Sequence, residues 1–340
     1  MSELTAAVDQ PSVVDMERQL EEMEDRLSVP GVTLMKDYSK GVRSSCGKLF
    51  KEGKVNDCIG IWQQAQKVIF FTANGTKQLE LQYDDELVIF LQESAEFFSK
   101  LQSPDENMNV FLFKKRIELY GLIFGLLEIA DEDSISPAIK QSISGLHRLC
   151  GLCHFRLKDM ESAFVELSEN ANILKDLPWS VPDAEWSESD TAACFNYCEA
   201  RLEAIECLKV QKKYPEAMSE YLEVLALCER LNEGSASVSM VKMLGGVCNN
   251  VAMCCYHTFQ YEKSLPYFER TLVAWEEVYG PDVPAVDQTR QNLATNRKLA
   301  AFTAEQEAKG ANITKMDLTN PRPLDQQEEK DKYFTKDDSK

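Results

Sequence analysis

Apolar residues recur at helical spacing on both sides of a short polar break in the C-terminal part of the chain. Before the break, Val251, Ala252 and Cys255 share one face of a helix. The break covers residues 257–260, and the apolar-rich stripe after it consists of Ser264, Phe268, Thr271, Leu272 and Trp275. The dipeptide Gly280-Pro281 ends this stripe, because glycine accepts a left-handed cap and proline cannot continue a helix. The pattern predicts two helices joined by a tight turn.

The same offsets recur in other parts of the sequence. Asn-Leu-Ala at 292–294 follows Asn-Val-Ala at 250–252 by 42 residues. In the predicted hairpin the small residue Ala252 is followed 12 residues later by a second small residue, Ser264, and four positions further on by the bulky residue Phe268. The segments that resemble it contain Cys46, Cys58 and Trp62; Gly151, Ala163 and Leu167; and Ile205, Leu208, Ala217 and Tyr221, with a turn at 212–215. These shared registers indicate repeats.

The chain between residues 31 and 308 therefore divides into predicted helical pairs. The predicted hairpins and helices are 31–71; the pair Leu79–Leu101 and Val110–Ala130; Pro137–Leu177; Ser187–Leu231; the hairpin at 245–280; and a last helix Val283–Ala308. Residues 1–30 carry eight acidic and two basic residues and form an acidic segment that we expect to be partly helical or disordered. Residues 309–340 are charged and poor in apolar residues, so we expect a disordered tail.

At residues 249–296 the pattern resembles a tetratricopeptide repeat, a helix-turn-helix unit of about 34 residues. The 42-residue spacing and the stretches NNVA, YEKSLPYFERTL and YGPDVP are similar to the repeats of kinesin light chains. Cys255 stands where that family usually has tyrosine, and Val283 where it usually has histidine. The resemblance implies an all-α fold: a right-handed α-solenoid of tetratricopeptide-like helical hairpins with a C-terminal capping helix.

Composition limits the partners and the compartment. The formal net charge of −19 argues against nucleic acid and anionic lipid as partners, since both require a basic surface. The most apolar run, Ile117–Ala130, is too short to span a bilayer and contains glutamates, so we expect no membrane insertion. No secretory signal is visible at the start, and the 11 cysteines are expected to be reduced and buried. These features favour a cytoplasmic protein.

One motif carries candidate metal chemistry. Cys150, Cys153 and His154 match the C-x-x-C-H pattern of haem attachment, and their spacing also places them on one helix face suited to zinc. The alternative is that they belong to a packed helix in which Gly151 takes the small-residue position. The alternative is favoured, because haem attachment needs export and zinc needs a fourth, distant ligand. The sequence contains no phosphate-binding glycine loop and no hydrolase or metalloprotease motif, so we expect no cofactor, no metal and no enzyme.

The resemblance implies that the first helix of each hairpin lines a concave groove. By register, the residues at groove positions are Asn249, Asn250, Met253, Tyr256 and His257; Gln288, Gln291, Asn292, Thr295 and Lys298; and Glu199, Glu203 and Glu206. Asparagine can donate to and accept from a peptide backbone at once. The alternative is that the asparagines make helix-start or inter-repeat hydrogen bonds. The three glutamates favour a basic partner.

The sequence thus predicts a non-enzymatic scaffold or adaptor that binds a peptide or helical segment of a partner protein in its groove. The alternative is a constitutive structural subunit of a larger multiprotein assembly. Two features have open roles: the tail could compete for the groove, and Trp179 and Trp186 could either form a binding edge or pin their loop to the helices.

Overall fold

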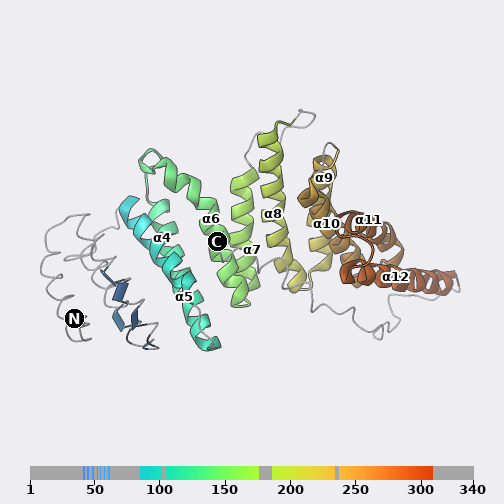
Figure 1. The fold of residues 1–340 in the computed structure, drawn as a ribbon, viewed down its shortest axis with the longest axis horizontal. Coiled ribbons are helices and arrows are strands. Elements are labelled where there is room, and N and C mark those ends of the chain that lie inside the picture. Colours follow the sequence, from blue (N-terminus) through green and yellow to red (C-terminus); the bar gives the residue numbers. More distant parts are fainter. Residues whose placement is uncertain are drawn as a thin grey trace, which may run out of the picture. The chain divides into compact units, whose positions relative to one another are not determined.

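In the computed structural model the described residues are 85–101, 105–175, 186–233 and 237–308, together with isolated positions between 41 and 61. They are helical apart from short turns (Figure 1), which confirms the all-α prediction. The chain divides into two compact units, 1–170 and 171–340. The predictions for residues 1–30 and 309–340, for Cys46, Cys58 and Trp62, and for Trp179 lie outside the described residues.

The first unit is built on packed antiparallel helices. Its elements are α4 (Asp85–Lys100), α5 (Glu106–Glu128), the short 3-10 helix η1 (Glu132–Ser134), α6 (Pro137–Arg156) and the greater part of α7 (Met160–Lys175). Helix α5 starts four residues before the predicted Val110, because the Asp105 carboxylate caps it by accepting from the backbone N–H of Asn107 at 2.9 Å. The core between α4, α5 and α6 contains Val88, Leu91, Phe98, Leu119, Ile123 and Ile139.

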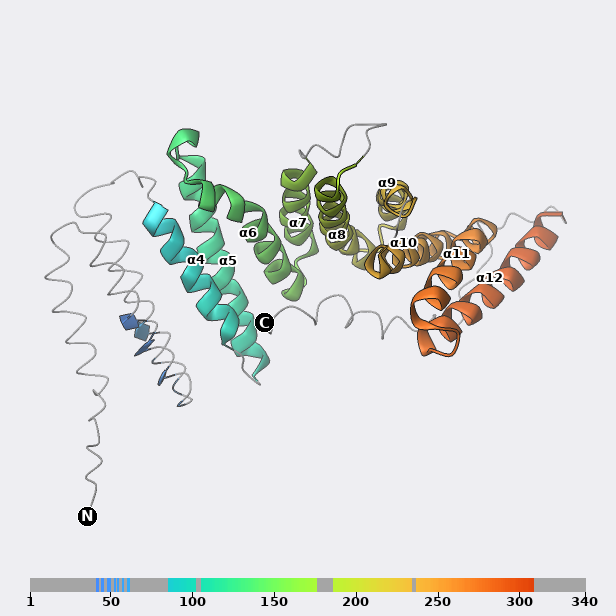
Figure 2. The ribbon, with the colours of Figure 1, turned by 45° about the horizontal axis from the view of Figure 1, so that its top comes forward.

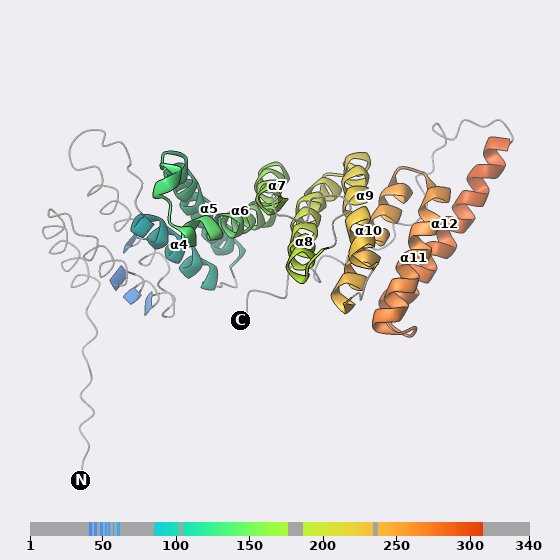
Figure 3. The same ribbon diagram turned by 90° about the horizontal axis from the view of Figure 1, so that it is seen from above.

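The second unit continues the same plan. Its described helices, after the end of α7, are α8 (Glu188–Val210), α9 (Tyr214–Leu231), α10 (Val238–His257), α11 (Tyr261–Tyr279) and α12 (Pro284–Ala308). Consecutive helices from α8 to α12 pack against each other, as Figures 2 and 3 show for α10, α11 and α12. The predicted break at 257–260 and the stop at Gly280 are confirmed to within a residue, and Gly280 has a φ of +82°. The turn predicted at 212–215 is instead 211–213, since α9 already begins at Tyr214.

The three hairpin turns share one backbone conformation. Their central residues, Lys158, Lys212 and Phe259, have φ values of 63°, 60° and 62°. In each turn the residue after the central one donates its backbone N–H to a carbonyl five residues earlier, as in Gln260 to Cys255 at 2.8 Å. These are Schellman-type helix ends in which a lysine or phenylalanine occupies the position that glycine usually takes. The repeated turn shows that the hairpins α6–α7, α8–α9 and α10–α11 are copies of the same repeat.

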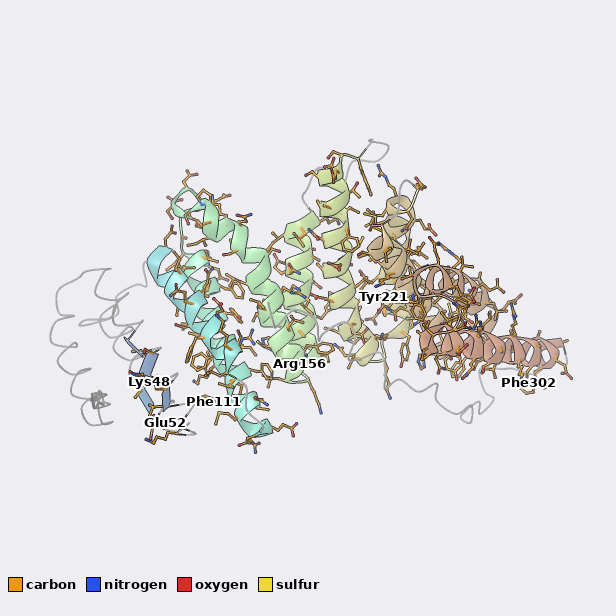
Figure 4. All side chains as sticks on the ribbon, viewed as in Figure 1. Lys48, Glu52, Phe111, Arg156, Tyr221 and Phe302 are labelled. Atoms are coloured by element: carbon orange, nitrogen blue, oxygen red, sulfur yellow. The ribbon has the colours of Figure 1, made fainter. Side chains whose placement is uncertain are left out.

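The residues with shared sequence offsets are buried at equivalent positions. The small residue in the first turn of each second helix is fully buried, and so is the bulky residue four positions further on. An exposed fraction of 0% is found for Ala163, Ala217 and Ser264 and for Leu167, Tyr221 and Phe268. Figure 4 shows Tyr221 among the packed helices of the second unit. A Cβ on Gly151 would lie 2.6 Å from Cγ of Leu167, which confirms close packing at the small-residue position. The predicted start of the last hairpin at residue 245 is wrong, because α10 begins at Val238. Gly245 and Gly246 therefore lie inside α10, and Gly245 packs against Trp275.

Helix α10 is the most apolar part of the second unit. Among the described residues it is the one helix long and apolar enough to cross a membrane by length and composition. The most apolar stretch of 18 residues in this helix is 61% buried inside the protein, and the neighbouring helices include α9 and α11. Burial of this kind is typical of the core helix of a packed helical domain.

Candidate functional site

A polar network links the first helices of two consecutive hairpins. Lys209 of α8 extends its ammonium group to the Glu206 carboxylate at 2.7 Å and to Oδ1 of Asn250 on α10 at 3.3 Å. The Lys209 and Glu206 side chains are 24% and 20% exposed, so the network lies at the surface, partly screened from water. Asn250 therefore makes a hydrogen bond between repeats, which was the alternative role considered for the asparagines. In this bond the Oδ1 atom of Asn250 is the acceptor, and its Nδ2 group keeps two N–H donors.

An aromatic cluster lies at the end of α10. The ring of His257 stacks on Tyr214 of α9, with ring centroids 4.2 Å apart and planes 8° from parallel, and it meets Tyr256 edge-on. Burial and the nearby cations of Lys209 and Lys212 hold the pKa of His257 below its usual value. The lowered pKa favours the neutral form of this partly buried imidazole near neutral pH.

Met253 connects this region to α12. It is partly buried and packs against the cluster formed by Ala252, Phe268 and Leu293. On α12 the residues Gln288, Gln291 and Lys298 are exposed, Thr295 is partly exposed, and Gln288 donates its amide to Oδ1 of Asn292 at 3.0 Å. The predicted groove residues of α10 and α12 therefore belong to two helices of one unit that share this apolar cluster with α11.

Some predicted binding residues do not lie at the surface. Asn249, Asn292 and Tyr256 are only 5%, 7% and 7% exposed, so their side chains contribute to packing more than to any external contact. The helix-start role considered for the asparagines is wrong, because Asn249, Asn250 and Asn292 lie within α10 and α12. Helical spacing shows which residues share a stripe but not how wide the buried part of that stripe is.

The acidic residues are less available than their number suggests. Glu199 is exposed, whereas Glu203 and Glu206 are partly buried, and Glu206 is already paired with Lys209. The sequence analysis gave no role to Tyr214, which the structure places against His257. The repeat register could have identified Tyr214. Like Tyr261, it is the first residue of a second helix and lies three positions before an equivalent buried residue, Ala217 or Ser264.

We define the candidate face as the exposed and partly exposed side chains of this region. They are Glu199, Glu203, Glu206 and Lys209 of α8; Tyr214 of α9; Asn250, Met253 and His257 of α10; and Gln288, Gln291, Thr295 and Lys298 of α12.

The C-x-x-C-H motif is part of a packed helix. Cys150 and Cys153 are 3% and 1% exposed in α6, and burial raises the pKa of the Cys150 thiol far above its ordinary value. His154 pairs through Nδ1 with the Asp159 carboxylate at 3.0 Å. Within the described parts of the chain, no three His, Cys, Asp or Glu side chains are grouped so that they could hold a metal ion.

Trp186 is the tryptophan of the α7–α8 loop that the structure describes. The guanidinium group of Arg230, on α9, lies over its ring with the carbon 4.0 Å from the ring centroid. A cation–π contact of this kind holds the loop end against the helices. It agrees with the interpretation that this residue pins its loop.

Comparison with known proteins identifies the class. Residues 246–301 match the family model described as tetratricopeptide repeat, which covers the end of α10, α11 and most of α12. The chain thus contains tetratricopeptide repeat sequence in this part, and its repeated hairpins make it a helical repeat protein. No curated protein sequence matches it significantly.

The solved structures that match the chain share little sequence with it. Apo RapI is 9% identical with a TM-score of 0.43, and the match covers 79% of this chain and 73% of RapI. BtubC (BKLC) from P. vanneervenii is 17% identical with a TM-score of 0.37, over 66% of this chain and 87% of BtubC. Aspartyl phosphate phosphatase F from Bacillus subtilis is 12% identical with a TM-score of 0.38, over 92% of this chain and 79% of the phosphatase.

Proposed function

We propose that this protein is a non-enzymatic interaction scaffold that binds a peptide or helical segment of a partner protein on the candidate face. The observation that carries the proposal is the network of Glu206, Lys209 and Asn250, which presents donors and acceptors on two rigid helices. Helices hold such groups in fixed positions, which lowers the entropy lost when a peptide binds. Met253 and the ring of His257 supply apolar surface beside the polar groups. Peptide recognition in a helical groove requires this combination.

Site-specific photocrosslinking in cells tests where partners bind. A photoreactive amino acid replaces Gln291 on α12 or Glu199 on α8, both exposed members of the candidate face. The matched controls carry it at Leu222 on α9 and Val273 on α11, which are 39% and 65% exposed and lie on second helices outside the face. We expect the same partner to be captured from both face positions and from neither control. Capture from the control positions alone contradicts the proposal and favours the constitutive subunit of an assembly.

A substitution in the network tests the role of the asparagine amide. Asn250→Ala removes a peptide-facing donor, so we expect the affinity for the captured partner to fall about tenfold, the equivalent of a hydrogen bond of about 1.4 kcal/mol. The control is Asn172→Ala, an exposed asparagine of α7 outside the face. Titration by calorimetry measures the affinity, and thermal unfolding shows that both variants remain folded. Equal binding by the two variants excludes Asn250 as a contact.

We also infer that the scaffold functions in the cytoplasm. The nine cysteines that the structure describes are free thiols, as expected for a reducing compartment. Fluorescence microscopy of the tagged full-length chain tests this inference, and accumulation in a secretory compartment would exclude it.

A further inference from the structure

The ends of two hairpins meet at one surface of the second unit. The turn 211–213 joins α8 to α9, and the turn 258–260 joins α10 to α11. Tyr214, directly after the first turn, stacks on His257, directly before the second. We call the surface formed by Lys212, Lys213, Tyr214, His257 and Phe259 the turn patch. It lies beside the candidate face and shares Tyr214 and His257 with it.

Support of the fold does not explain why a phenylalanine occupies position 259. It is 58% exposed, and its φ of 62° is a left-handed conformation that costs a residue with a side chain about 1–2 kcal/mol. The equivalent positions of the other two turns are occupied by Lys158 and Lys212, so the turn itself has no need of an aromatic ring. Phe259 makes an edge-on contact with Tyr261 at 6.3 Å but leaves most of its surface to solvent. Strained, exposed residues of this kind are often functional.

The patch is locally basic on an acidic protein. Lys212 and Lys213 are exposed, and the pKa of the neighbouring His257 is lowered by burial and by two lysines, Lys209 and Lys212. The carboxylate nearest to Lys209, that of Glu206, is engaged in its ion pair. Two further exposed carboxylates, Glu216 and Glu262, lie in the first turns of α9 and α11, where helix N-termini partly offset their charge. The chain as a whole carries a net charge of −19, so a cationic surface with an exposed aromatic ring is a local exception.

We propose that the turn patch is a second docking surface, which binds an acidic protein segment containing an apolar side chain. The apolar side chain packs on Phe259, and the carboxylates of the segment pair with Lys212 and Lys213. Charge complementarity favours this partner, because the chain as a whole is acidic and repels an acidic segment, whereas Lys212 and Lys213 attract it. The surface uses the ends of the hairpins and does not require binding on the candidate face.

Fluorescence anisotropy with a labelled synthetic peptide, rich in Asp and Glu and carrying one central Phe, tests the proposal on the full-length chain. Two companion peptides replace the acidic residues with Asn and Gln, or the Phe with Ser. We expect the acidic peptide with Phe to bind at least about tenfold more tightly than either companion, and to bind more weakly as salt increases. Equal binding of the acidic and amide peptides, or no binding of the acidic peptide, overturns the proposal.

Variants locate the site. The double variant Lys212→Glu/Lys213→Glu should weaken binding about tenfold or more. Lys158→Glu changes the same residue type in the same kind of turn of the first unit and should leave the affinity unchanged. Phe259→Lys installs the residue that the other two turns tolerate, so it removes the ring with little risk to the fold. We expect it to abolish the preference for Phe over Ser in the peptide.

Two further measurements distinguish the turn patch from the candidate face and from a contact between two copies of the chain. Asn250→Ala should leave the acidic peptide bound, so that failure of the candidate face and failure of the turn patch are distinguishable. Self-association of the chain that disappears in Phe259→Lys, measured by analytical ultracentrifugation, would show that a second copy covers the patch and would overturn the proposal.

Discussion

At the residue scale, single atoms decide which positions of the repeat can vary. Gly145 and Gly151 both lie inside α6, but a Cβ on Gly145 would have no neighbour within 4 Å. A Cβ on Gly151 would lie 2.6 Å from Cγ of Leu167 and 3.2 Å from Cβ of Glu166. Because Leu167 is fully buried, it cannot move aside without cost.

The two glycines therefore respond in opposite directions to alanine. We expect Gly151→Ala to lower the free energy of unfolding by about 1–3 kcal/mol through overpacking. We expect Gly145→Ala to raise it by about 0.5–1 kcal/mol, because alanine favours the helix and meets nothing. Urea unfolding followed by circular dichroism measures both. Stabilisation by Gly151→Ala would show that the helices do not approach as closely as described.

His257 gives the stability a pH dependence of known sign. Its pKa is lowered in the folded protein by burial and by Lys209 and Lys212, so the unfolded chain takes up the proton first as the pH falls. The folded state is therefore progressively destabilised below about pH 6.5, the ordinary pKa of histidine, until the lowered pKa is passed. His257→Phe keeps a ring against Tyr214 and removes the titration. Its stability relative to the natural protein should rise on acidification from neutral pH, as measured by urea unfolding; a constant difference would contradict the shift.

At the scale of the element, hairpins are predictable from sequence more reliably than surfaces. The small residue, the polar turn and the buried residue 16 positions on recur because two close-packed helices require them, so the turn and the second helix of the hairpin predicted at 245–280 are confirmed. The start of α10 at Val238 was not predicted, because the sequence does not show that Gly245 lies inside a helix, where it packs against Trp275. Burial of Asn292 was missed for a related reason. The width of a buried stripe depends on the neighbouring helix, and the period of the sequence does not contain that information.

The last described helix is fastened by a buried amide that the sequence analysis did not identify. Asn296 is fully buried, accepts from Oγ of Ser264 on α11 at 2.9 Å, and donates to the carbonyl of Asn292 at 2.9 Å. Its neighbour Arg297 instead makes an exposed ion pair with Glu269 at 2.8 Å. The two residues are adjacent in sequence but differ entirely in environment.

This difference predicts unequal effects on α12. Asn296→Ala removes two buried hydrogen bonds, so we expect a loss of about 1–3 kcal/mol and faster hydrogen exchange along α12. Arg297→Ala removes an exposed pair and should cost at most about 1 kcal/mol. Hydrogen exchange with mass spectrometry distinguishes them. Equal protection of α12 in both variants would mean that Asn296 does not hold the helix.

At the scale of the whole molecule, cysteine is used as a small apolar core residue. The chain has 11 cysteines, and the nine that the structure describes are buried and free. Burial raises the pKa of Cys248 to about 11 and those of Cys207 and Cys254 to about 12. Cys194 differs, since a hydrogen bond from Cys198 lowers its pKa, but its exposed fraction is 0%. The prediction that the cysteines are buried is confirmed for these nine.

The same thiols report on how the two units unfold. Only thiolates react rapidly with iodoacetamide, so in the native protein we expect none of the nine buried cysteines to be labelled on the timescale that modifies an exposed thiol. In increasing urea, Cys150 and Cys153 report on the first unit, and the seven described cysteines of the second unit report on that unit. Because each unit is compact by itself, we expect two groups of labelling transitions, resolved by mass spectrometry of the peptides. Rapid native labelling of Cys194 or its neighbours would show that the second unit opens locally, and a single common transition would show that both units unfold together.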